Sequence, residues 1–204
     1  MRAHILFAWL FVVMIGPTAP LHAQSGASDP AAFIGDFSQK GISDILAADI
    51  PNNEKQSRFR DMFDQYFDIP YIGRFVLGRY LRLTDEVQRD KFGTLFEDVI
   101  VHTWSRRFSE YDGQTLKVNS TVDDGDNGAI VKSQIVGNDG SNIGVDWRLR
   151  KRGTTFQVVD VIVEGVSMAI TYRQEYSTVI SRGGGFDGLL GEMQKQVDNL
   201  KGAG

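Results

Sequence analysis

The chain has 204 residues, a formal net charge of −4 at neutral pH and no cysteine. Non-specific binding to nucleic acid requires a basic face, so this charge argues against a nucleic-acid partner. The lack of cysteine excludes disulfides and thiolate metal sites, and the stability of the fold must therefore come from burial of apolar surface.

The N-terminus has the pattern of a secretory signal peptide. A short basic start precedes an apolar run from Ile5 to Gly16, and the cleavage signal follows up to Ala23. The run is shorter than the roughly 20 residues that a membrane span needs, and no cysteine follows it for lipid attachment. We expect residues 1–23 to be removed on export, and residues 24–204 to form one domain with a net charge near −5 after the loss of Arg2.

The first part of the mature chain has the periodicity of helices. An amphipathic stretch from Phe33 to Leu46 ends before Pro51, and a second helix follows in which Asn53 and Gln56 resemble a capping box. A short helix then begins at Pro70 and ends near Gly78.

The clearest helix follows these three. Thr84 is the predicted cap, and Asp85 and Glu86 lie in the first turn, where negative charge is favourable. Apolar residues from Val87 to Phe108 recur at helical spacing, so we expect this helix to be buried along its whole length.

The period then changes from 3.6 to 2. Turn-forming clusters rich in Gly, Asn and Asp separate four predicted strands, which are Gln114–Val122, Ala129–Val136, Ile143–Arg150 and Thr155–Glu164. Short links of this kind join antiparallel neighbours, so the sheet is a meander.

Two helices close the chain, one over about Val166–Arg182 and one from about Phe186, with Gly183–Gly185 as the hinge between them. The predicted fold class is α+β, a four-stranded antiparallel meander with helices before and after it packed on one face. The bowl between helices and sheet is the place for a ligand, in an apolar cavity.

Candidate catalytic groups are few, because His102 is the only histidine of the mature chain. Gly165-Val166-Ser167-Met168-Ala169 approaches the G-x-S-x-G motif of a hydrolase, but that motif belongs to a parallel sheet and its histidine follows the serine. We interpret Ser167 as a helix cap. The acidic hairpin Asp123–Gly128 lacks the ligand spacing of a calcium loop. We therefore expect no enzyme, no metal and no cofactor.

The last predicted strand has one face formed by three valines, Val159, Val161 and Val163, which we expect to line the interior. Asp160 and Glu164 lie on the opposite face with Val158 and Ile162. We interpret both carboxylates as structural, in ion pairs with Arg148, Arg150 or Arg173.

An ordered set of motifs carries a resemblance to a known family. The set comprises Phe67-Asp68-Ile69, Leu77-Gly78-Arg79-Tyr80, Trp147-Arg148-Leu149-Arg150, the block from Val159 to Ser167, Tyr172-Arg173 and Gly183-Gly184. Together these motifs, within a match from about Ile34 to Val197, resemble the toluene-tolerance or MlaC-like family of periplasmic phospholipid carriers.

The resemblance implies a function as well as a fold. Members of the family hold acyl chains inside the bowl with the head group at its mouth, and they shuttle lipid between an outer-membrane complex and an inner-membrane ABC transporter. They are not enzymes. The implied partners are thus a phospholipid and, transiently, these two complexes, and we expect a periplasmic monomer. A relative is associated with hopanoids, so that cargo stays open, as does an adaptor that binds only protein.

The resemblance also suggests which apolar residues contact lipid. From the inward strand faces we select Val145, Trp147, Leu149, Val159, Val161 and Val163, and from the helices Phe75, Val76, Phe96, Val99, Ile100 and Ile170. An ordinary filled core explains each of them equally well. Arg74, Arg79 and Arg82 either attract a phosphate head group at the cavity mouth or form the solvated face of a helix.

Overall fold

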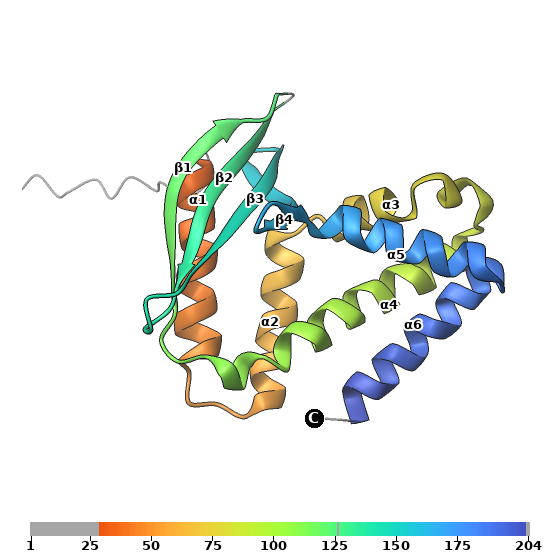
Figure 1. The fold of residues 1–204 in the computed structure, drawn as a ribbon, viewed down its shortest axis with the longest axis horizontal. Helices are drawn as coiled ribbons and strands as arrows, with labels where there is room; N and C mark the ends of the chain where they lie inside the picture. The colour runs from red at the N-terminus through yellow and green to blue at the C-terminus, as the bar shows by residue number, and fades with distance from the viewer. Residues whose placement is uncertain (1–28, 126, 203–204) are drawn as a thin grey trace, which may run out of the picture.

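The computed structural model describes residues 29–125 and 127–202, and the predicted signal peptide, residues 1–23, lies outside them. Figure 1 shows helices before and after a single sheet. The helices before it are α1 (Pro30–Lys40), α2 (Asn52–Tyr66), α3 (Ile69–Leu77) and α4 (Glu86–Ser105), and those after it are α5 (Met168–Arg182) and α6 (Gly185–Gly202). Three shorter helical segments are η1 (Gly41–Leu46), η2 (Gly78–Leu83) and η3 (Phe108–Glu110).

The sheet is the predicted antiparallel meander with one short strand added. Its strands lie in chain order, β1 (Thr115–Asp123), β2 (Gly128–Val136), β3 (Asn142–Arg152), β4 (Thr155–Val163) and β5 (Val166–Ser167). The α+β class is confirmed. The fifth strand has two residues and pairs with the end of β4, so the chain returns along the sheet edge immediately before α5 begins.

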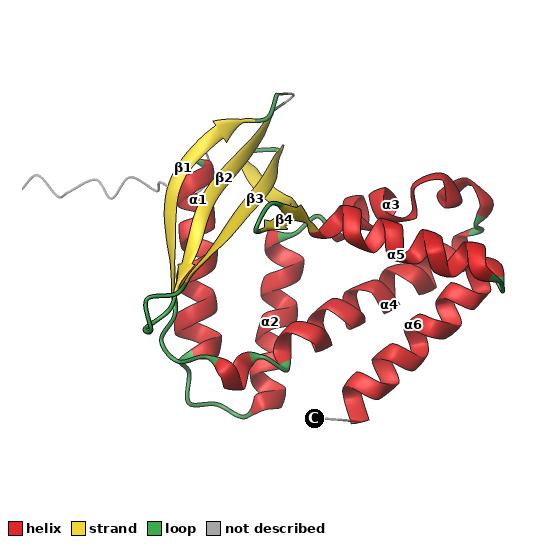
Figure 2. Ribbon diagram, in the orientation of Figure 1, coloured by secondary structure: helices red, strands yellow, loops and turns green. Residues whose placement is uncertain are grey.

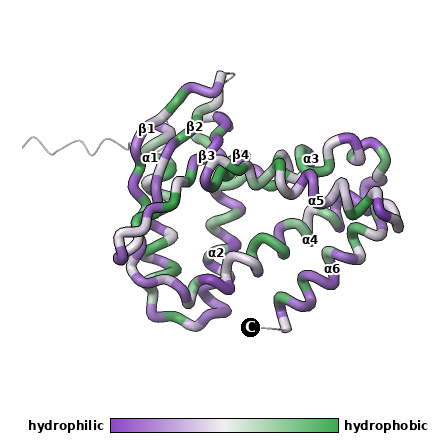
Figure 3. The backbone as a smooth tube through the Cα atoms, in the orientation of Figure 1, coloured by the Kyte–Doolittle hydropathy of each residue, from purple (hydrophilic) through white to green (hydrophobic). Residues whose placement is uncertain are grey.

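The helices form two groups, as Figure 2 shows. Helices α1 and α2 contact the sheet, where the ring of Phe37 in α1 lies 5.2 Å from that of Trp147 and Phe33 lies 6.4 Å from Phe156. Helix α4 packs on α2, α3 and α6, and α5 packs on α3 and α6. Along α4 and α6, hydrophobic and hydrophilic segments alternate, as expected of helices with one buried side (Figure 3). None of the helices in the described part of the chain is both long and apolar enough to span a bilayer.

A β-bulge changes the predicted faces of β4. Arg148 pairs with Asp160 but the next residue, Leu149, pairs with Val158, so Val159 is an extra residue in the strand. Beyond the bulge Val161 is opposite Trp147 on the inner face, whereas before it Val158 takes the inner position and is fully buried. The prediction of one all-valine inner face was therefore wrong, because a bulge shifts side-chain alternation by one residue.

Two predicted helix caps were also wrong. Helix α2 begins after Pro51 without a side-chain cap, and Gln56 instead contacts Nδ1 of His102 at 2.8 Å and donates to Ser105 Oγ at 2.8 Å. The cap of α4 is Asp85, which forms a capping box with Gln88, while the hydroxyl of Thr84 donates to the carbonyl of Leu81. At the start of α2, Pro51 offers only its backbone carbonyl, which accepts from the N–H groups of Glu54 and Lys55 at 3.0 Å, whereas the carboxylate of Asp85 caps α4.

The sequence predicted that α4 is buried along its whole length, and this prediction was wrong. Its middle is buried, with Phe96 fully inaccessible, but Val87 in its first turn is 76% exposed and Trp104 near its end is 41% exposed. Val87 and Trp104 thus lie outside the buried side of the helix.

The junction between sheet and α5 confirms one prediction and corrects another. Ser167 caps α5, since its Oγ accepts from the N–H of Ile170 at 3.1 Å. Asp160 supports the cap, because it accepts from the hydroxyl of Ser167 at 2.6 Å and from the N–H of Ala169 at 3.0 Å. The predicted ion pairs of Asp160 and Glu164 with arginines are absent from the described residues.

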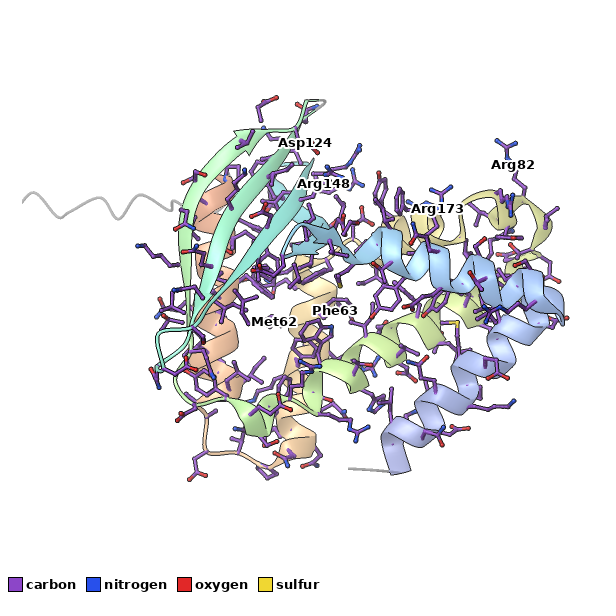
Figure 4. The ribbon with its side chains drawn as sticks, in the orientation of Figure 1. Met62, Phe63, Arg82, Asp124, Arg148 and Arg173 are labelled. Carbon is purple, nitrogen blue, oxygen red and sulfur yellow. The ribbon has the colours of Figure 1, made fainter. Side chains whose placement is uncertain are left out.

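Glu164 and Arg148, one of the three arginines expected as its partner, are engaged elsewhere. Glu164 accepts from the backbone N–H of Gly144. Arg148 lies 3.1 Å from a carboxylate oxygen of Asp124 at the end of the sheet, where Figure 4 shows the two side chains together. Backbone N–H groups at the start of α5 and near the start of β3 thus take the place of the expected arginines as partners of Asp160 and Glu164.

Candidate functional site

Helix α3 is fixed at both ends and so defines the walls of two grooves. At its start, Asp68 accepts from the N–H of Tyr71 at 3.0 Å and from Nε of Arg152 at 2.9 Å, while Phe67 bridges to Val158 at the edge of β4. At its end, Gly78 has a φ of 52° and a ψ of −121°, a conformation that L side chains rarely adopt. The chain turns there into η2.

The first groove lies between α3 with η2 and α5, and we call it the α3–α5 groove. Its volume of about 650 Å³ is within the usual range for small-molecule sites. It is lined by Phe75, Val76, Leu77, Arg79, Tyr80, Ile170, Arg173, Gln174, Ser177 and Thr178.

The chemistry of the α3–α5 groove combines an apolar wall with cations. Four of its lining residues are apolar, two are arginines, and none carries a carboxylate. Within the described residues neither Arg79 nor Arg173 forms an ion pair. Arg79 donates from Nη2 to the hydroxyl of Tyr80 at 3.0 Å, and the guanidinium of Arg173 lies 5.2 Å from the ring centre of Phe75. Both guanidinium groups therefore keep donors for a ligand.

Tyr80 and Ser177 connect the two walls of this groove. The hydroxyl of Tyr80 lies 3.4 Å from Oγ of Ser177 on α5. Hydrogen bonding with Ser177, and then with Arg79, lowers the pKa of Tyr80 below its ordinary value. The phenol oxygen is thus stabilised as an acceptor by the same residues that line the groove.

The second groove lies on the other side of α3, between α2, α3 and α4, and we call it the α2–α4 groove. It is larger, about 1140 Å³, and shares Leu77 with the first. Its apolar residues include Phe67, Ile69, Leu81 and Phe92, and its charged residues are Asp64, Asp68, Arg74, Glu86, Arg89, Asp90 and Glu97. Five carboxylates against two arginines give this groove a negative charge.

An aromatic cluster lies between α4 and α5. Tyr176 in α5 has its ring centre 5.9 Å from those of Phe92 and Tyr172 and 6.3 Å from that of Phe96. Burial raises the pKa of Tyr172, and it raises that of Tyr176 strongly. The hydroxyl of Tyr176 is buried and has no hydrogen-bond partner in the described chain, so this part of the interior is apolar.

Most of the residues selected from the sequence lie in one interior. The main hydrophobic cluster contains Val76, Phe96, Val99, Ile100, Val145, Trp147 and Leu149, all buried, with Val161 partly buried against it. The other four are separate from this cluster. Phe75 and Ile170 line the α3–α5 groove, Val159 is buried at the bulge, and Val163 is half-buried near the end of β4. Lipid contact by any of the twelve stays a prediction.

The three arginines selected for a head group lie in three places. Arg79 lines the α3–α5 groove, Arg74 lines the α2–α4 groove, and Arg82 lines neither and points away from the body of the molecule (Figure 4). The sequence reasoning missed Arg173 as a member of this set, although it named the residue as an ion-pair partner.

A signal for the second wall was present in the sequence. The α5 residues that line the α3–α5 groove are Ile170, Arg173, Gln174, Ser177 and Thr178, which recur at the three- and four-residue spacing of one helix face. The side of α5 that is polar in sequence is thus one wall of the groove.

The possible hydrolase residues have other partners. Ser167 is bonded to Asp160 and caps α5, while His102 lies against Gln56 of α2. Among the residues that the structure describes, no three His, Asp or Glu side chains gather as a metal site would require.

Known proteins similar to this chain agree on one family. The model of the family described as MlaC protein matches residues 38–195. The intermembrane phospholipid transport system binding protein MlaC of Haemophilus influenzae is 23% identical over 202 residues, which cover 93% of this chain and 92% of that protein. The toluene tolerance protein ttg2D of Pseudomonas putida is 25% identical over 171 residues, which cover 76% of this chain and 80% of that protein.

A solved structure agrees in fold. The phospholipid-binding protein of Ralstonia solanacearum, determined in complex with a phospholipid, superposes with a TM-score of 0.75 at 19% identity and covers 85% of this chain and 99% of its own. The family model covers most of the sequence. The chain belongs to the MlaC protein family.

Proposed function

We propose that this protein is a periplasmic lipid carrier that holds the acyl chains of a phospholipid in its apolar interior and shuttles the lipid between an outer-membrane complex and an inner-membrane ABC transporter. Membership of the MlaC family supports the proposal, as does the name of the Haemophilus relative, a binding protein of intermembrane phospholipid transport. The observation that carries it is the α3–α5 groove, which joins an apolar wall to two arginines without a carboxylate.

The energetics of acyl chains explain why such a carrier is needed. Each methylene that leaves water gains about 0.8 kcal/mol, so two chains of about 15 methylenes gain on the order of 24 kcal/mol in an apolar interior. Compared with a membrane the same chains gain almost nothing. Transfer between membranes is therefore nearly balanced, and the partners must give it direction.

No covalent bond is made or broken in this transfer, so the carrier needs no catalytic group. Its task is to exclude water from the chains and to release them to a partner. The proposal therefore assigns the buried apolar residues to chain binding and Ser167 to the cap of α5 alone.

The first test is the lipid content of the mature protein purified from cells in which it is exported. Native mass spectrometry followed by solvent extraction should find phospholipid in near-stoichiometric amount. A polycyclic lipid in its place would redirect the proposal to hopanoid carriage. A protein that purifies without lipid, and stays without it after incubation with liposomes, would overturn lipid carriage in favour of a protein-binding adaptor.

A pair of neighbouring substitutions tests where the chains lie. Val161 is opposite Trp147 on the inner face of the sheet, and Ile162 is opposite Asp146 on the outer face, and both are half-buried. Val161→Trp should fill space beside the interior and lower lipid occupancy severalfold, since overpacking leaves less room for a chain. Ile162→Trp should leave occupancy unchanged. Native mass spectrometry reads occupancy only on folded molecules, and equal occupancy in the two variants would argue against chain binding at this face.

A further inference from the structure

We infer that the α3–α5 groove is the head-group site, in which the guanidinium groups of Arg79 and Arg173 bind the lipid phosphate. The inference rests on the proposed function, because it assumes that the ligand is a phospholipid. It adds a phosphate site, its two cations and a direction for the lipid, with its phosphate at α5 and η2 and its chains leading past Val76 and Leu77, which line the groove and also belong to the buried interior.

The α3–α5 groove has the charges that a phosphate requires. A phosphate ester has several acceptor oxygens and a negative charge, and arginine binds it with more than one N–H donor. Arg79 and Arg173 come from different elements, η2 and α5, and line one groove that contains no carboxylate. No acidic residue of the groove therefore competes with the phosphate for these donors.

The backbone at Gly78 leaves the space that the guanidinium of Arg173 occupies. An added Cβ at this residue would lie 2.8–2.9 Å from Nη2, Cζ and Nε of Arg173. Only a residue without a side chain lets the guanidinium of Arg173 lie this close to the end of α3, above Phe75. The position of the cation thus depends on a glycine whose φ of 52° also favours glycine.

The apolar wall of the groove includes an exposed side chain. Ile170, which lines the groove together with Phe75, is 47% exposed, and Val166, which lies four residues earlier in β5, is 54% exposed. Exposed apolar residues next to cations match a ligand in which a phosphate is joined to apolar chains. Free inorganic phosphate would use the arginines alone and leave these residues in water.

Polar side chains complete the groove. Tyr80, Gln174, Ser177 and Thr178 offer hydroxyl and amide groups within the same lining. Such groups hydrogen-bond the ester and glycerol oxygens that separate a phosphate from acyl chains. The α2–α4 groove lacks this combination, because five carboxylates would repel a phosphate there.

The experiment compares three proteins with three probes. The proteins are the wild type, Arg79→Gln/Arg173→Gln, and Arg74→Gln as the matched control, since Arg74 is an arginine of the neighbouring helix α3 that lines the acidic groove instead. The probes are a short-chain phosphatidylglycerol, a diacylglycerol with the same chains, and inorganic phosphate. Binding of each probe is measured by calorimetry on lipid-free protein, with circular dichroism to confirm the fold.

We expect the double variant to bind phosphatidylglycerol at least about tenfold more weakly than wild type, because two charge-assisted contacts are lost. Its binding of diacylglycerol should be unchanged, and Arg74→Gln should bind both lipids as wild type does. Arg79→Lys/Arg173→Lys should recover part of the loss, since lysine keeps the charge without the planar donors.

Three outcomes would overturn the inference. One is phosphatidylglycerol binding that the double variant retains, which leaves the lipid carrier proposal intact. Another is an equal loss with Arg74→Gln, which indicates a general effect of charge. The third is inorganic phosphate that binds wild type as tightly as the lipid does, which indicates an anion site unrelated to head groups. Failure of wild type to bind either lipid would instead contradict the proposed function itself.

Discussion

The two grooves beside α3 differ more in charge than in shape. They share Leu77, yet the smaller has two arginines and no carboxylate, and the larger has five carboxylates and two arginines. Volume alone would select the α2–α4 groove, whereas the chemistry of an anionic amphiphile selects the α3–α5 groove. A lipid phosphate is negatively charged and is repelled by carboxylates. The charge of a groove is therefore a better criterion than its volume for locating the phosphate site.

Two carboxylates of the larger groove have structural partners. Asp68 is bonded to Arg152, and Glu97 accepts from Arg60, which also donates to Asp98 at 2.6 Å. These contacts fasten α3 to the sheet and α2 to α4. In the α3–α5 groove, Arg79 and Arg173 have no anionic partner within the described residues, which is the state expected of a site that receives an anion from its ligand.

The largest effect on stability should come from Gly78 at the end of α3, next to Arg173 of the α3–α5 groove. Gly78→Ala should destabilise the fold by about 1–3 kcal/mol, because alanine is strained at positive φ and its Cβ meets the guanidinium of Arg173. Gly93→Ala is the matched control in the other groove. Its Cβ would meet nothing within 4 Å, so alanine in the middle of α4 should stabilise by about 0.5–1 kcal/mol.

Thermal unfolding of these two variants checks the comparison. The melting temperature should fall for Gly78→Ala and rise for Gly93→Ala. If both variants shift it in the same direction, the special conformation of Gly78 is not what fixes the end of α3. Binding of phosphatidylglycerol by Gly78→Ala should also weaken, since Arg173 would have to move.

A smaller loss of stability should follow from substitution of Asp68, which holds the start of α3. The Asp68 side chain is 11% exposed, it caps α3, and it pairs with an Arg152 side chain that is 42% exposed. Asp68→Ala removes the cap and the pair and should destabilise by about 2 kcal/mol, whereas Asp68→Asn retains a capping oxygen and should cost about 1 kcal/mol. Denaturant titration measures both. Equal losses would show that the charge, and not the cap, matters at this end.

Several features of the fold were predictable because local chemistry determines them. The strand–turn–helix junction at Ser167 was recognised from its sequence, and the structure places the capping hydroxyl as expected. The meander followed from turn clusters between strands of period 2. Each of these signals lies within a few residues of the structure that it specifies.

Features that depend on distant partners were missed. The bulge at Val159 arises from the register between β3 and β4, and no local pattern marks one extra residue in an apolar strand. Gln56 was interpreted as part of a cap, but in the fold it meets His102 and Ser105, which lie far along the chain. The same holds for the site. Arg79 was selected by its charge, whereas Arg173 joins it only because α5 packs beside α3.

The smallest effect should be a loss of stability in mild acid that is caused by His102 of α4, where it packs against α2. His102 is buried against Gln56, and Asp98, Lys201 and Arg60 are its charged neighbours. Burial lowers the pKa of this imidazole below its ordinary value of 6.5, and Asp98 opposes the shift only in part. In the unfolded chain the ring takes up its proton at higher pH than in the fold, so acid favours unfolding.

The pH window follows from this direction. The stability that neutral His102 contributes is present above pH 6.5 and is lost as the pH falls below 6.5, until the buried ring is itself protonated and Nδ1 can no longer accept from Gln56. Denaturant unfolding of wild type between pH 7.5 and 5 should show the loss, and His102→Gln should show less of it. Phosphatidylglycerol affinity should stay constant over the same range, because the lining of the α3–α5 groove contains neither histidine nor a carboxylate. A fall in affinity that follows the fall in stability would mean that the two sides of α3 are coupled, and that the grooves are not independent.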